Sequence, residues 1–360
     1  MSAKARIYLD HAATTPMRPE ATAAMVEGVG RWANPSSPHA EGRAAKDALE
    51  GARARIKASL GWTGELIFTS GASEALSIGL GRADAARRLV SAVEHDAVFR
   101  AAPGPVIMPV QEGQVDQDAL QQQLRVAGRA IVAIQQVNSE TGTLLLPNVT
   151  DPVIDMVRDA GGLLLSDCSQ SAGKRPMPDA DMLVLSAHKL GGPPGIGALL
   201  VRDFAMLKPQ GGQEQGYRAG TENLPGVLGF AAAVEASGQQ ANGTGGVEVL
   251  EAMCRLKDAV WGAGGQLVTG GGGNCIHIMA LAAPSKSAAA QLIGFDAAGF
   301  AVSAGSACSS GSLKPSRVLK AFGVLDEVAA RTIRVSTGWN TTVAEIEAFQ
   351  ATWLDIAGQA

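Results

Sequence analysis

The fold of this chain is decided by two apolar runs: Gly162-Leu163-Leu164-Leu165-Ser166, which ends in Asp167, and Met182-Leu183-Val184-Leu185, which opens into Ser186-Ala187-His188-Lys189. Short, continuous apolar runs of this kind are typical of strands that are buried in a parallel sheet. The carboxyl ends of such strands meet at one edge of an α/β sheet, and ligands bind in the crevice there. We therefore expect Asp167 and Lys189 to face the same crevice.

An acid and a lysine in that position suit a pyridoxal phosphate enzyme. The lysine amine can form a Schiff base with the cofactor aldehyde, and the carboxylate can keep the ring nitrogen protonated so that the ring accepts electrons. Each residue also has a commoner role, because Asp167 could cap a helix and Lys189 could be a solvated loop residue. The rest of the sequence decides between these roles.

The composition indicates a globular protein with more than one hydrophobic core. A chain of 360 residues exceeds what a single core usually holds, so we expect one large and one smaller domain. The net charge of −4 argues against nucleic acid or an anionic membrane as the main partner, because either would favour a clustered basic excess.

The cysteines lie far apart, at Cys168, Cys254, Cys275 and Cys308, and form no Cys-x-x-Cys pair. Neither a disulfide framework nor a structural zinc site is therefore expected. No apolar stretch approaches the length of a membrane span, and the N-terminal segment is too short and too polar for a signal peptide. These features predict a cytoplasmic protein with free thiols, no metal site and no membrane partner.

Helix-like and strand-like segments alternate from about residue 17 to about residue 235, which predicts an α/β domain with a mostly parallel, seven-stranded sheet between helices. The turn before Ala198–Arg202 predicts one antiparallel strand. A polar, glycine-rich stretch, Ser237–Gly246, is interpreted as a loop between domains. The predicted division is a large domain of residues 15–245 and a small α+β domain of residues 1–14 and 246–360, which contains the Cys308 segment.

Further candidate residues follow the expected strand ends. Thr69–Ala75 opens a helix with small and hydroxyl residues, which indicates either a phosphate site or a simple N-cap. Ser186 and His188 favour the phosphate site. His95 could stack on a planar ring and shuttle protons, although a lone histidine is more often a satisfied polar residue.

Two other residues, Asn138 and Arg334, each have two possible roles. Asn138 could donate a hydrogen bond to a ring oxygen or a substrate carboxylate, or it could belong to a turn. Arg334 lies in an apolar run, where its guanidinium needs an anion. That anion could be a substrate carboxylate or a structural acid.

Cys308 lies in Val302–Ser312, a run of small and polar residues that offers a cysteine nothing to pack against. The run predicts a mobile, exposed loop that carries a nucleophilic thiol.

Five stretches, taken together, identify a family: Tyr8–Pro16, Asn34–Arg43, Ser186–Lys189, Arg218–Asn223 and Gly305–Cys308. With them the chain resembles the cysteine desulfurases of the class V aminotransferase group, which are pyridoxal phosphate enzymes of fold type I. The similarity runs from Tyr8 to about Phe349.

The resemblance implies a cofactor site. Lys189 would form the Schiff base, Asp167 would pair with the pyridine nitrogen, Gln170 would contact the phenolic oxygen and His95 would stack on the ring. The phosphate would be held by Ala72, Ser73, Ser186 and His188. Thr221 would reach the phosphate of the partner subunit, so activity would require a homodimer.

The resemblance also implies a reaction. Asn138 and Arg334 would clamp the carboxylate of L-cysteine, and Lys189 would move its α-proton with help from His95. The Cys308 thiolate would attack the substrate sulfur, giving L-alanine and a Cys308 persulfide. A sulfur-acceptor protein, such as a scaffold for iron–sulfur cluster assembly, would then receive the sulfur.

Other functions stay open from the residues alone. A selenocysteine lyase or another class V aminotransferase would need the same clamp. A catalytically silent scaffold of the same fold is less compatible with intact Lys189, Asp167, His95 and Cys308.

Overall fold

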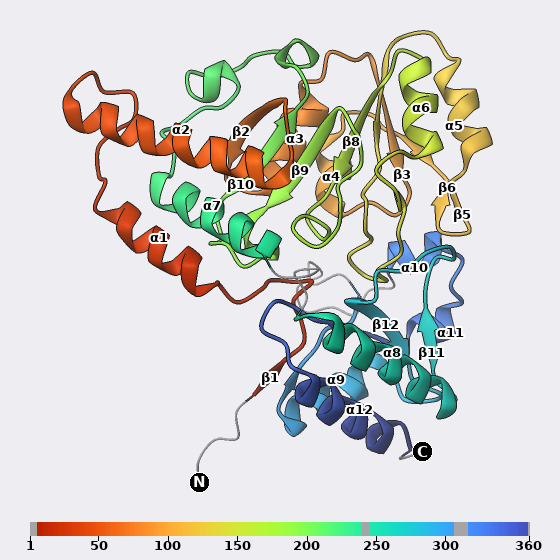
Figure 1. Cartoon of the computed structure of the whole chain (residues 1–360). Helices are drawn as coiled ribbons and strands as arrows, with labels where there is room; N and C mark the ends of the chain where they lie inside the picture. Colours follow the sequence, from red (N-terminus) through yellow and green to blue (C-terminus); the bar gives the residue numbers. More distant parts are fainter. Residues whose placement is uncertain (1–5, 240–244, 306–315, 359–360) are drawn as a thin grey trace.

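The largest sheet of the protein places the ends of its parallel strands at one edge. The computed structural model describes residues 6–239, 245–305 and 316–358. The sheet has seven strands, in the order β2 (Glu65–Thr69), β10 (Gly197–Val201), β9 (Met182–Ser186), β8 (Leu163–Asp167), β7 (Ala130–Ala133), β3 (Arg87–Ser91) and β4 (Val106–Met108). The strands from β9 to β4 run parallel, and β10 is antiparallel to both of its neighbours. Figure 1 shows this sheet in the upper part of the molecule.

Side chains alternate along these strands and so build a separate hydrophobic cluster on each face. Leu66 and Leu164 belong to the first cluster, whereas Ile67 and Leu165 belong to the second. Because both faces are buried, the strands read as continuous apolar runs in the sequence. The first cluster is covered by α1 (Pro19–Val29), α2 (Ala40–Leu60), α5 (Gln117–Leu124), α6 (Pro152–Asp159) and α7 (Leu224–Gln239).

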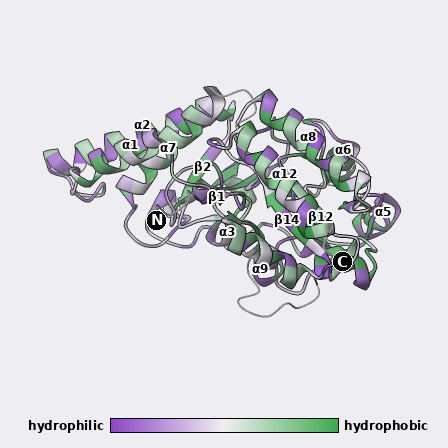
Figure 2. Cartoon of the chain, turned by 90° about the horizontal axis from the view of Figure 1, so that it is seen from below, coloured by the Kyte–Doolittle hydropathy of each residue, from purple (hydrophilic) through white to green (hydrophobic). Residues whose placement is uncertain are grey.

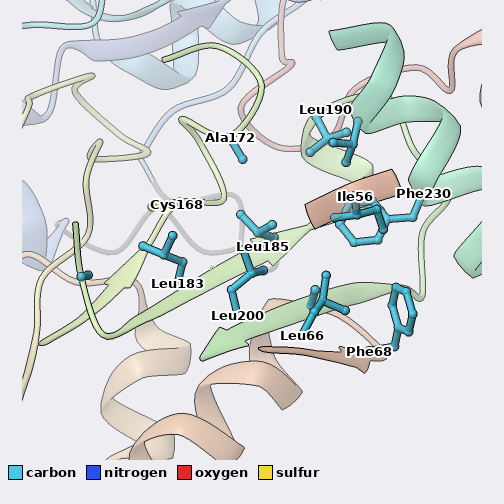
Figure 3. Close-up of a cluster of buried hydrophobic side chains, with 14 of the residues drawn as sticks. Ile56, Leu66, Phe68, Cys168, Ala172, Leu183, Leu185, Leu190, Leu200 and Phe230 are labelled. Carbon is cyan, nitrogen blue, oxygen red and sulfur yellow. The ribbon is translucent and has the colours of Figure 1, made fainter. Parts of the chain in front are cut away.

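The second face is covered by α3 (Ala72–Gly81), which follows β2, and by α4 (Asp96–Ala101), which follows β3. The first cluster is seen in Figure 3, where Ile56 of α2 and Phe230 of α7 lie over Leu66, Leu185 and Leu200 of the sheet. Packing on both faces therefore fixes the sheet edge that carries the polar residues.

Helix α2 shows how local sequence sets the ends of a helix. His39 is its N-cap and accepts a hydrogen bond from Gly42 N through Nδ1 at 3.2 Å. Gly61 ends it with a left-handed φ of 65°, which glycine adopts without strain. Figure 2 shows purple and green segments alternating along α2, as expected for a helix with one buried side.

A second, antiparallel sheet consists of β11 (Gln266–Val268), β12 (Ile278–Ala282) and β14 (Thr332–Ser336). Helices α8 (Val247–Gly262), α9 (Ala288–Ala298) and α12 (Val343–Gly358) pack on it around Phe295, Phe349 and Trp353. The strand β1 (Ile7–Tyr8) pairs in parallel with β13 (Phe300–Ala301), so the start of the described chain lies in the same lower part of the molecule as α9 and α12 (Figure 1). The remaining elements are β5 (Val110–Gln111), β6 (Gln114–Val115), α10 (Arg317–Ala321), α11 (Asp326–Ala329) and short 3₁₀ turns at Ala187–Lys189, Phe204–Met206 and Glu214–Gly216.

The predicted fold class, the seven strands and the antiparallel strand are confirmed. The loop predicted from Ser237 begins too early, because α7 continues to Gln239 and Ser237 is buried with its hydroxyl bonded to Val234 O. The division into residues 15–245 and residues 1–14 with 246–360 stays a prediction. Among the described residues, no helix has both the length and the apolar character needed to cross a bilayer.

Candidate active site

A cavity of about 410 Å³ lies where strands β3, β8 and β9 end. Volumes of roughly 300 to 1,000 Å³ are usual for cofactor and small-molecule sites. Ala12 and Ala13 from the N-terminal segment and Arg334 from β14 complete its walls, so distant parts of the chain close it. Nine of the predicted site residues line it: Lys189, Asp167, Gln170, Ser186, His188, His95, Ala72, Ser73 and Arg334.

Lys189 and Asp167 reach the cavity from neighbouring parallel strands. Asp167 is the last residue of β8 and accepts a hydrogen bond from Ser169 N at 2.9 Å. Lys189 lies in the 3₁₀ turn after β9, and its Nζ donates to Ala12 O and to Ala13 O, the latter at 2.8 Å. The amine is thus held at the cavity wall by backbone carbonyls.

His95 is fixed by its own place in the backbone. It is the N-cap of α4, and its Nδ1 accepts a hydrogen bond from Ala97 N at 3.2 Å. The neutral imidazole therefore carries its proton on Nε2. Burial lowers the pKa of His95, the nearby Asp167 carboxylate opposes this shift, and Lys189 adds to it. The ring is therefore neutral at physiological pH.

The start of α3 forms a cup of backbone amides at the other end of the cavity. Residues 70–73 line it, and Gly71, the N-cap, has a φ of 145°. Free amides at a helix start bind anions such as phosphate. The Glu74 carboxylate also lines the cup and accepts from Ser70 N, but Arg218 pairs with it at 3.1 Å and offsets its charge.

Ser186 and His188 lie at the end of β9 and beyond it. Ser186 is buried, and His188 Nδ1 lies 3.0 Å from Thr14 Oγ1. Burial and the neighbouring Lys189 lower the pKa of His188 to about 4. His188 is therefore a neutral hydrogen-bonding group at the cavity wall.

Two buried polar atoms in the cavity wall test whether a cofactor fits. Gln170 Nε2 donates to Ala12 O at 2.9 Å, but Gln170 Oε1 and Ser169 Oγ have no hydrogen-bond partner among the described residues. Leaving buried polar atoms unpaired costs free energy, so a ligand with polar substituents is expected beside them. An amine, a carboxylate, a stacking ring and an amide cup are the groups that pyridoxal phosphate requires.

Asn138 does not line the cavity, although Val137 and Ser139 do. Its Oδ1 accepts hydrogen bonds from Glu140 N, Thr141 N and Thr141 Oγ1, and its Nδ2 donates to Val93 O at 3.1 Å. The turn that the sequence left as an alternative is thus present. The proposed role of Asn138 as a substrate ligand stays a prediction.

The described residues do not test the roles of two other predicted residues. Thr221 is exposed and is not part of the cavity wall. Cys308 lies outside the described residues. Their predicted roles stay predictions.

Sequence reasoning missed the buried acid next to His95. Glu94 is 1% exposed, and its Oε1 accepts a hydrogen bond from Gln135 N at 2.8 Å. Burial raises the pKa of Glu94 well above its usual range, and the nearby Asp167 adds to this. The signal was available, because Glu94 directly follows the apolar strand end that precedes His95.

The family model "Aminotransferase class-V" matches residues 7–349. The chain belongs to this family. A cysteine desulfurase of Frankia sp. (strain EuIK1) is 35% identical over 94% of this chain and 88% of that protein. A putative cysteine desulfurase, IscS 1 of Bacillus subtilis (strain 168), is 32% identical over 95% of this chain and 96% of that protein.

Solved structures agree with the family assignment. The crystal structure of a NifS-like protein from Rickettsia africae ESF-5 is 28% identical, covers 98% of this chain and 99% of its own, and superposes with a TM-score of 0.87. SspA, solved in complex with cysteine, is 26% identical, covers 93% of this chain and 100% of its own, and has a TM-score of 0.75. The predicted family, fold type and dependence on pyridoxal phosphate are confirmed, and the desulfurase interpretation is favoured over a selenocysteine lyase.

Proposed function

We propose that this class V aminotransferase family member removes sulfur from L-cysteine and releases L-alanine, with Cys308 as the residue that receives the sulfur. The observation that carries the proposal is the single cavity that joins Lys189, Asp167 and His95 to the buried guanidinium of Arg334. The first three suit an amino-acid reaction on a pyridine aldehyde. The guanidinium suits the carboxylate of the amino acid.

The residues that would hold pyridoxal phosphate are Lys189 at the aldehyde, Asp167 at the ring nitrogen, Gln170 at the phenolic oxygen, His95 over the ring, and Ala72, Ser73, Ser186 and His188 at the phosphate. When bound, the cofactor supplies an electron sink for the carbon atoms of the substrate. Its phosphate would lie against the amide cup at the start of α3, where the helix dipole also favours an anion.

The protein groups divide the remaining work. Arg334 would orient L-cysteine through its carboxylate, and the Lys189 amine would take the α-proton. The neutral His95 would offer its Nε2–H to the substrate. The Cys308 thiolate would attack the substrate sulfur: an S–S bond forms, the C–S bond breaks, and its electron pair stays with carbon, which is then protonated.

We include a homodimer and a sulfur-acceptor protein in the proposal. Thr221 is exposed on this chain, as a residue that completes a partner's phosphate site must be. Trp32 is 80% exposed and Val29 is 65% exposed at the end of α1, and large apolar side chains at a surface favour a protein contact. Sedimentation of the purified protein tests the dimer separately from activity.

The central experiment gives L-cysteine to the purified protein and measures L-alanine and sulfide. We expect equal amounts of both products when a thiol reductant is present. Cys308→Ala should abolish sulfide release but keep the cofactor absorbance band at about 400 nm, whereas Lys189→Ala should lose that band. Sulfide release that is unchanged in Cys308→Ala would contradict the role of that thiol.

A further inference from the structure

Arg317, the first residue of α10, contacts the turn that carries His95. Its Nη1 donates to Ala92 O, and its Nη2 donates to Glu94 O at 2.6 Å. The same guanidinium pairs with Asp96 at 3.2 Å, and its Cζ lies 4.0 Å from the centroid of the Phe99 ring. One side chain thus contacts the turn on both sides of His95.

The carbonyl of Val93, between those of Ala92 and Glu94, is hydrogen-bonded by two other side chains. Val93 O accepts hydrogen bonds from Gln135 Nε2 at 2.5 Å and from Asn138 Nδ2 at 3.1 Å. Three successive carbonyls, at residues 92, 93 and 94, are therefore occupied by side chains. The peptide planes before His95 cannot rotate without breaking some of these bonds.

The contacts around this turn form a closed network. Asn138 Oδ1 accepts from Glu140 N at 3.0 Å, and the buried Glu140 accepts from Ser316 Oγ through Oε2 at 2.6 Å. Ser316 is also the N-cap of α10 and holds Leu319 N at 3.1 Å. The start of α10 is thereby bound both to the His95 turn and to the turn of residues 138–141.

We propose that Arg317 is a positioning residue for His95. Arg317 does not line the cavity, whereas His95 does, so it acts through its contacts with residues 92–99 on either side of His95. The use of His95 in catalysis rests on the proposed function, but the contacts of Arg317 do not. Lysine cannot replace it fully, because only the guanidinium fork reaches two carbonyls and a carboxylate while it lies over a ring.

The competing account is an ordinary surface ion pair. The Arg317 side chain is 42% exposed and Asp96 is 52% exposed, and pairs of this kind contribute about 0 to 1 kcal/mol. Such a pair would not control the local order of residues 93–98. The two accounts therefore differ in a measurable way: a positioning role predicts that loss of Arg317 reduces the local order of residues 93–98 while global stability stays nearly the same, and a surface ion pair predicts no change in that local order.

The experiment compares Arg317→Met and Arg317→Lys with Arg255→Met, a control that removes an exposed arginine paired with Glu347 at 3.5 Å in the same domain. Amide hydrogen exchange of residues 93–98 is measured in cofactor-free and cofactor-loaded protein. In Arg317→Met we expect exchange about tenfold faster or more in both states, with a melting temperature close to that of the wild type. We expect partial rescue in Arg317→Lys and no change in Arg255→Met.

Enzyme kinetics and the cofactor absorption spectrum give a second test of the proposal. In Arg317→Met, kcat for L-cysteine should fall by about ten- to a hundredfold with KM nearly unchanged, because a small displacement of His95 affects the reaction and Arg334 is untouched. The absorption band of the bound cofactor should shift with the environment of the ring. Wild-type exchange at residues 93–98 in Arg317→Met would overturn the proposal, as would faster exchange with no change in either kcat or the band.

A wild-type protein that does not act on L-cysteine would contradict the proposed function rather than the role of Arg317. In that case the exchange data and the cofactor band still decide whether Arg317 positions His95.

Discussion

Arg334 Nη2 donates to Asp10 Oδ1 at 2.8 Å, and this ion pair joins β14 to the N-terminal segment at the wall of the cavity. The guanidinium side chain is 3% exposed, and its Nη1 donates to Ser139 O at 2.9 Å. The ion pair and the carboxylate site were competing interpretations of the sequence. In the folded chain the paired arginine also faces the cavity, so an incoming carboxylate would compete with Asp10 for it.

Arg334→Lys should lower kcat/KM for L-cysteine by about a hundredfold, mainly through KM, because an ammonium cannot bind a carboxylate through a planar fork. Steady-state kinetics measure this. Asp10→Asn removes the competing carboxylate and should lower KM instead. Equal KM values in the wild type and Arg334→Lys would exclude Arg334 as the carboxylate ligand.

His11 should make the stability of the protein depend on pH. Burial lowers its pKa from the ordinary value of 6.5 to about 3, with a further lowering from Lys174. At pH values between about 3 and 6.5, His11 is protonated in the unfolded chain but neutral in the folded one. The free energy of unfolding therefore decreases as the pH falls below 6.5. At about pH 5 the loss relative to about pH 7 is about 2 kcal/mol.

Urea unfolding of the wild type and His11→Asn at both pH values measures this. The difference in free energy of unfolding between the two proteins should move by about 2 kcal/mol in favour of the variant at the lower pH. A difference that stays constant would show that His11 takes up a proton in the folded state as readily as in the unfolded chain.

Arg53→Met should lower the free energy of unfolding by about 3 to 5 kcal/mol, because it leaves the buried carboxylate of Glu214 without its charge partner. Arg53 Nη1 donates to Glu214 Oε2 at 2.8 Å, and the two side chains are only 8% and 1% exposed. Chemical denaturation measures the change. Arg55→Met, on the same helix but in an exposed pair with Glu235, should cost no more than about 1 kcal/mol. Similar losses in both variants would argue against the buried pair.

Gly197→Ala should weaken cofactor binding by about tenfold or more, because overpacking here displaces the amide cup. A Cβ at Gly197 would lie 2.8 Å from Gly71 Cα and 2.5 Å from Leu185 O. Titration of cofactor-free protein with pyridoxal phosphate measures the affinity. Gly51→Ala, whose Cβ would meet nothing within 4 Å, is the control and should bind the cofactor like the wild type.

The sheet and the cavity were predictable because both follow from local pattern. Apolar runs of strand length predicted β8 and β9, with ends that agree to within a residue. Parallel strands bring their carboxyl ends together, so Asp167, Lys189 and His95 could be placed at one crevice from their positions after strands.

The hydrogen bonds of the polar side chains were not predictable. The sequence left Asn138 as a substrate ligand or a turn residue, and the folded chain commits both ends of its amide to backbone and hydroxyl partners. No local pattern in the sequence pointed to the role of Arg317, because its hydrogen-bond partners lie 221 to 225 positions earlier in the chain.

The sequence by itself determined the α/β architecture, the family and the identity of most groups around the cavity, because strand periodicity and strand ends are local properties. Only the tertiary structure decided which of those groups remain available to a substrate. Asp10 meets Arg334, and Arg317 meets the His95 turn, only after segments that lie far apart in the chain pack together. Distances between such remote segments depend on packing and not on sequence separation.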